Sequence, residues 1–116
     1  MRLTIPAALD MIASHHDGVT RHLLKSPIRT KPVAHARQEA MVVFMDAYEM
    51  SLTQVGHILS RDHTTVLHGC RAANKRAAKC PDTAARINAM CEASGTPKFT
   101  SSRPDGVVFK SRRAAQ

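Results

Sequence analysis

Apolar residues recur at helical spacing along most of the chain, and short polar stretches separate the periodic segments. The first segment follows Thr4, a residue type that caps helix N-termini, and its apolar stripe consists of Ile5, Ala8, Leu9 and Ile12. His15 to Gly18 end this helix. A second, short helix is indicated by Val19, Leu23 and Leu24, and it stops before Pro27.

A basic loop follows, with the sequence Ser-Pro-Ile-Arg-Thr-Lys-Pro over residues 26–32. We expect no regular helix in this loop, because Pro32 lacks a backbone N–H and disfavours helical geometry at Lys31. The clearest helical period begins after it and runs from about Val33 to Glu49. Its buried stripe is formed by Met41, Phe44, Met45 and Tyr48.

Two further helices separated by a tight turn are predicted over residues 51–79. Ser51 and Gln54 match the capping box that opens a helix, and its stripe consists of Leu52, Val55, Ile58 and Leu59. Gly56 lies inside this helix, where close packing against another helix would favour the missing side chain. The turn is Ser60-Arg61-Asp62, and the next helix runs from about His63 to Lys79.

The helix over residues 63–79 has two distinct faces. One is apolar and carries Val66, Cys70, Ala73 and Ala77; the other is polar and basic and carries Thr64, His68, Arg71 and Lys75. A last helix is expected from Thr83 to Ala93, with Ile87, Met90 and Cys91 facing inward. The pattern therefore predicts an all-α domain over residues 1–95, followed by a basic, disordered tail over residues 96–116.

Composition agrees with a small helical domain that binds a polyanion. Aromatic residues are only 3% of the 116 residues while apolar residues are 43%, so the core must be aliphatic. The net charge is +8 and the pI about 10.1, which favours a nucleic-acid partner. We expect no membrane span and no signal peptide, and the three cysteines, which lack C-x-x-C spacing, indicate free thiols in the cytoplasm.

No pattern of catalytic or metal-binding residues is present. His63 and His68 are five residues apart, so they do not share the helical face that two zinc ligands need. There is no glycine-rich phosphate loop and no G-x-S-x-G motif. We therefore expect no enzyme, no metal, no cofactor and no small-molecule substrate.

The turn and the start of the second helix carry side chains suited to contacts with DNA. Asp62 can cap the helix through the backbone N–H of Thr64 or Thr65, or accept a hydrogen bond from a cytosine amino group. His63, Thr64 and Thr65 can donate to base acceptors or phosphates, and Arg71 lies further along the same helix with Lys75. The alternative is an ordinary helical pair with a solvated charged face.

The sequence Arg-Asp-His-Thr-Thr-Val-Leu-His over residues 61–68 resembles the signature of the C-terminal DNA-binding domain, domain IV, of the bacterial replication initiator DnaA. The resemblance extends to residues 19–25, 36–41, 51–56 and 68–71. It covers about Ile5 to Ala93, nearly the whole predicted domain.

This resemblance implies a Trp-repressor-like helix-turn-helix that binds double-stranded DNA at the A/T-rich, nine-base-pair DnaA box. It implies that Asp62, His63 and Thr64 contact bases in the major groove, that Thr65 contacts a phosphate or a thymine methyl, and that Arg29 enters the minor groove. Phosphate contacts are implied for Lys31, Arg37, Gln38 and backbone groups near Leu52 and Thr53. Arg61 and His68 complete the expected interface, together with Arg71 and Lys75.

Three departures from the family pattern bear on function. No counterpart of the family's ATPase domain is present, so we expect a stand-alone binder. The turn is one residue shorter, with Leu59-Ser60 in place of a glycine-containing stretch, which could tilt the recognition helix. The loop is less basic, with Pro27 and Ile28 where family members often carry Lys or Arg.

The expected function is sequence-specific binding of duplex DNA by a bacterial regulator of transcription or replication, in the cytoplasm and at the nucleoid. Other replication or transcription proteins are possible partners. Two alternatives stay open: a protein-interaction module on a helix-turn-helix scaffold, and a non-specific architectural binder driven by the basic tail.

Overall fold

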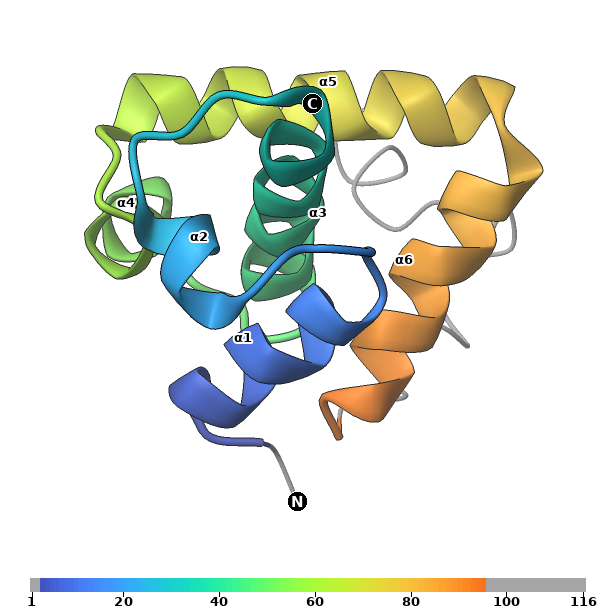
Figure 1. Ribbon diagram of the computed structural model, residues 1–116, viewed down its shortest axis with the longest axis horizontal. Coiled ribbons are helices and arrows are strands. Elements are labelled where there is room, and N and C mark those ends of the chain that lie inside the picture. Colours follow the sequence, from blue (N-terminus) through green and yellow to red (C-terminus); the bar gives the residue numbers. More distant parts are fainter. Residues whose placement is uncertain (1–2, 96–116) are drawn as a thin grey trace.

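The computed structural model describes residues 3–95, and over that range it consists of six helices and no strand (Figure 1). The helices are α1 (Ile5–Ser14), α2 (Arg21–Lys25), α3 (Lys31–Asp46), α4 (Leu52–Leu59), α5 (His63–Lys79) and α6 (Pro81–Ala93). This confirms the all-α prediction. The expected tail, residues 96–116, lies outside the described residues.

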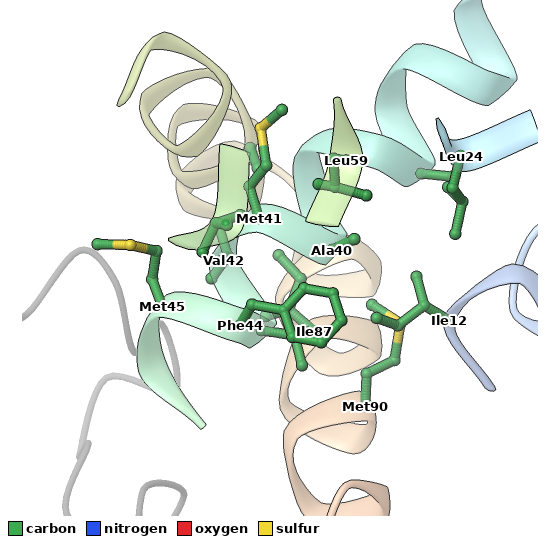
Figure 2. Packing of buried hydrophobic residues seen from close by; sticks show 14 of the residues in the cluster. Ile12, Leu24, Ala40, Met41, Val42, Phe44, Met45, Leu59, Ile87 and Met90 are labelled. Atoms are coloured by element: carbon green, nitrogen blue, oxygen red, sulfur yellow. The ribbon is translucent and has the colours of Figure 1, made fainter. Parts of the chain in front are cut away.

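The fold is organised around α3, which contacts each of the other five helices. Most of its residues are buried because neighbours pack on every side of it, and Phe44, in its last turn, is fully buried. Figure 2 shows the Phe44 ring among Ile12 of α1 and Ile87 and Met90 of α6. In Figure 1, α5 crosses one end of α3, which places the second helix of the helix-turn-helix on the outside of the molecule.

The predicted start and end of α3 were wrong. The helix begins at Lys31 rather than Val33, because Pro32 lies in the first turn, where the backbone N–H it lacks would have no intrahelical acceptor anyway. It ends at Asp46 rather than Glu49, and Glu49 has a positive φ of 55°. Tyr48, beyond the helix end, is still buried, and its hydroxyl donates to the Leu3 carbonyl at 2.8 Å.

The helix α6 also begins earlier than predicted, at Pro81 rather than Thr83, because the first turn of a helix accepts proline. Cys80 precedes it as the N-cap and is exposed, whereas Cys70 and Cys91 are buried. Hydrogen bonds from the side chain and backbone of Thr83 lower the pKa of the Cys80 thiol.

A buried ion cluster, not expected from the sequence, joins α3 to its neighbours. Glu39 is fully buried; it accepts hydrogen bonds from Arg86 Nε at 2.8 Å and Arg86 Nη2 at 2.7 Å, and lies 3.0 Å from His16 Nε2. Arg76 of α5 approaches it to 3.9 Å. Burial by itself raises the pKa of Glu39, but the hydrogen bonds from Arg86 and His16 outweigh it and lower the pKa to about 2.

Candidate nucleic-acid interface

The capping box predicted for α4 is present. The Ser51 hydroxyl accepts from the backbone N–H of Gln54 at 3.1 Å, and the Gln54 side chain accepts from the backbone N–H of Ser51 at 2.9 Å. Helix geometry leaves the backbone N–H groups of Leu52 and Thr53 in the first turn without an intrahelical acceptor. These two groups can therefore donate to an anion such as a phosphate.

The turn between α4 and α5 closes tightly against Gly56. Ser60 adopts the left-handed conformation (φ 58°, ψ 46°), and the backbone N–H of Arg61 donates to the Gly56 carbonyl at 2.8 Å. A Cβ atom at Gly56 would run into the Arg61 carbonyl oxygen. Gly56 thus permits close packing, as predicted, but the atoms it accommodates belong to the turn and not to another helix.

Asp62 caps α5, which is one of the two roles expected for it. Its Oδ1 accepts from the backbone N–H of Thr65 at 2.7 Å, and this hydrogen bond lowers the pKa of the carboxyl group. Asp62 is exposed. The carboxylate therefore fixes the start of α5 while lying at the surface.

The two faces of α5 are arranged as predicted. Its apolar residues are buried against the core: Val66, Cys70, Ala73 and Ala77. The polar residues expected at the interface are exposed: His63, Thr64, Thr65, His68, Arg71 and Lys75. The N-terminal end of α5 thus presents hydrogen-bonding side chains to solvent, and basic side chains follow along the helix.

The loop between α2 and α3 is held from inside by Arg37. This side chain is only 5% exposed. Its Nε donates to the Leu24 carbonyl at 2.9 Å, and its Nη2 donates to the carbonyls of Ser26 and Ile28, each at 2.9 Å, and of Leu23 at 3.1 Å. The residue expected to contact phosphate is thus occupied with the loop backbone, while Arg29 and Lys31 are exposed.

Arg61 joins this loop to the helix-turn-helix. Its Nη2 donates to the Ser26 carbonyl at 2.6 Å, and its Nη1 donates to the carbonyls of Ser60 at 3.0 Å and Leu59 at 3.2 Å. The Ser26 carbonyl therefore accepts from both Arg37 and Arg61. No sequence motif predicted this contact, because its partners are 35 residues apart.

A concave cleft of about 400 Å³ lies between the loop, α3 and α5. Three arginines line it, and burial together with the charges of Arg61 and Arg29 lowers the pKa of Arg37. Gln38 also lines the cleft and accepts from Arg76 Nη1 at 2.6 Å. Cations gathered along one cleft raise the local positive potential, which favours an anionic partner.

The sequence prediction missed part of the cleft wall. Thr65 and His68 were expected at the interface, but Gly69 and Ala72 lie beside them, with Ala34 and Met41 from α3. The spacing of Gly69 and Ala72, four and seven residues after Thr65, was the available signal. Gly69 also lets the Met41 side chain of α3 pack against α5, because a Cβ there would run into the Met41 sulfur.

Residues 3–95 contain no group of three or more His, Cys, Asp or Glu side chains that could hold a metal ion. None of the six helices is long and apolar enough to cross a membrane.

Comparison with known proteins agrees with this geometry. Residues 8–72, more than half of the chain, match the family model of the bacterial dnaA protein helix-turn-helix. The chain is 36% identical over 70 residues to the chromosomal replication initiator protein DnaA of Chloroflexus aggregans, a match that covers 60% of this chain and 14% of that protein. It is 32% identical over 80 residues to the corresponding protein of Lachnoclostridium phytofermentans, a match that covers 68% of this chain and 17% of that protein.

The match to the initiator of Deinococcus radiodurans is similar, at 29% identity over 82 residues, with 71% of this chain and 17% of that protein covered. The chain thus spans less than a fifth of the length of these relatives. The matched segment contains the capping box, the turn and the exposed end of α5. The chain belongs to the bacterial DnaA helix-turn-helix family, whose domain binds double-stranded DNA.

Proposed function

We propose that the chain binds duplex DNA sequence-specifically at a DnaA-box-like site. One observation carries the proposal: the polar N-terminal end of α5 and the loop bearing Arg29 flank the same positively charged cleft. A helix presented in this way suits the major groove, and an exposed arginine beside it suits the adjacent minor groove.

The proposed division of contacts combines the family resemblance with the position of each residue. Asp62, His63 and Thr64 lie at the end of α5 that would enter the major groove, where they contact base edges. Thr65 contacts a phosphate or a thymine methyl, and Arg29 enters the minor groove. The remaining residues contact the DNA backbone and set the register: Lys31, Gln38, His68, Arg71, Lys75 and the backbone N–H groups of Leu52 and Thr53.

The biological role is that of a regulator of transcription or replication acting at the nucleoid. The relatives are named chromosomal replication initiators, so a chain with this domain can occupy the sites at which an initiator binds. Competition for such sites is the simplest form of regulation. Other replication or transcription proteins are further partners.

Fluorescence anisotropy with two labelled duplexes, one carrying a DnaA box and one scrambled, tests this function across a salt series. We expect a preference for the box of at least about a thousandfold, with both affinities falling as salt rises. Equal, steeply salt-dependent binding would contradict base-specific recognition. Absence of binding to either duplex would favour a protein-interaction module on the same scaffold.

A further inference from the structure

We infer that Arg61 is a positioning residue that couples the two DNA-contacting parts of this domain: with Arg37 it fixes the loop bearing Arg29 relative to the start of α5. This inference rests on the proposed function. It adds that the major-groove and minor-groove contacts are made as one rigid unit, because a hydrogen bond from Arg61 joins the loop directly to the turn before α5.

The hydrogen bond from Arg61 to the Ser26 carbonyl is well placed to couple the loop to α5. The Ser26 carbonyl has two lone pairs, and it accepts one hydrogen bond from Arg37 at 2.9 Å and one from Arg61 at 2.6 Å. Arg37 belongs to the central helix α3, whereas Arg61 belongs to the turn directly before the Asp62 cap. The loop is therefore fixed both to the core and to the end of α5.

Two further hydrogen bonds hold the loop backbone at Ile28, near the attached Ser26 carbonyl. The Ile28 carbonyl accepts from Arg37 at 2.9 Å, and the Ile28 backbone N–H donates to the Ser26 hydroxyl at 3.3 Å. The backbone on the N-terminal side of Arg29 is thus held at two points, while Arg29 itself is exposed. A guanidinium that is carried on an ordered backbone loses less freedom when it enters the minor groove.

The fork shape of arginine makes this attachment possible. Arg61 Nη1 donates to the Ser60 and Leu59 carbonyls, and Nη2 donates to the Ser26 carbonyl. One planar group thus contacts the turn and the loop at the same time. The ammonium of a lysine has no such fork, so Arg61→Lys keeps the charge and weakens the link.

A double-mutant cycle measured by anisotropy on the box duplex tests the inference. In the wild-type background we expect Arg29→Ala to weaken binding about tenfold. In the Arg61→Ala background we expect the same change to weaken it less than about threefold, because Arg37 then holds the loop to α3 but nothing fixes it directly to the start of α5. The control background is Arg71→Ala, which removes one exposed charge from α5 and should leave the full tenfold effect.

Backbone ¹⁵N relaxation of the free protein provides a readout that does not depend on DNA. We expect the order parameters of Ile28, Arg29 and Thr30 to match the helices, at about 0.85, in the wild type and in Arg71→Ala. In Arg61→Ala we expect them to fall clearly below that value, because Arg37 alone then holds the loop. Should Arg61→Ala fail to fold, Arg61→Lys takes its place in both experiments.

Two results would overturn the inference: an unchanged effect of Arg29→Ala in the Arg61 variant, or unchanged order in the loop. If Arg29→Ala has no effect even in the wild-type background, the minor-groove contact of the proposed function has failed. The relaxation data then decide separately whether Arg61 holds the loop.

Discussion

Replacing the buried Glu39 by glutamine removes the charge that gathers Arg86, His16 and Arg76 while keeping the shape of the side chain. The lowering of its pKa from 4.5 to about 2 corresponds to about 3 kcal/mol of stability at neutral pH, at about 1.4 kcal/mol per pKa unit. Breaking a buried ion pair costs about 3–5 kcal/mol, and the partly exposed Arg86 can turn to water, so the lower figure applies. For a domain of this size we expect the melting temperature to fall by about 10–25 °C.

Urea and thermal unfolding, followed by circular dichroism, measure this cost, with Glu92→Gln as the control because Glu92 is an exposed carboxylate on α6. The pKa of Glu39 is lower in the folded protein, so its contribution is fully present above about pH 4.5 and is lost as the pH falls through about 2. The gap between wild type and Glu39→Gln should therefore close over that window. A cost below about 1 kcal/mol, or a gap that stays constant down to pH 2, would refute the assigned role of the ion cluster.

Three further substitutions test the interface and the turn. Thr64→Ala should cost about 1–3 kcal/mol on the box duplex and much less on scrambled DNA, as measured by anisotropy, and equal losses would exclude a base contact. Lys75→Ala should weaken binding to all sequences alike and reduce the salt slope by about one unit; an unchanged slope would place Lys75 away from the phosphates. Gly56→Ala should destabilise the domain by about 1–3 kcal/mol in urea unfolding, because its methyl group meets the Arg61 carbonyl, and a stabilised variant would contradict that packing.

Local signals in the sequence predicted most of the helix-turn-helix. The Ser51 capping box and the predicted bounds of α5, His63 to Lys79, agree with the structure, because each depends on residues a few positions apart. The predicted starts of α3 and α6 were wrong because of how a nearby proline was interpreted. Pro32 was treated as a helix breaker, and α6 was expected to begin two residues after Pro81, although the first turn of a helix accepts proline.

The contacts that hold the interface together could not be predicted in this way. Arginine is a residue type that commonly contacts DNA, yet Arg37 and Arg61 both donate hydrogen bonds to carbonyls of the loop. The partners of Glu39, His16 and Arg86, are 23 and 47 residues away from it. Which cation meets a backbone carbonyl and which one meets solvent depends on how the helices pack, and periodicity carries no information about that.

The exposure of Cys80 makes the orientation of the domain on DNA directly measurable. Cys70 and Cys91 are buried, so a thiol-reactive dye would attach at Cys80 in the folded protein, and the lowered pKa of that thiol speeds the reaction. Cys80 follows the last residue of α5, about 25 Å from its DNA-contacting end. Energy transfer to an acceptor on one or the other end of an asymmetric duplex would show which way α5 points along the site.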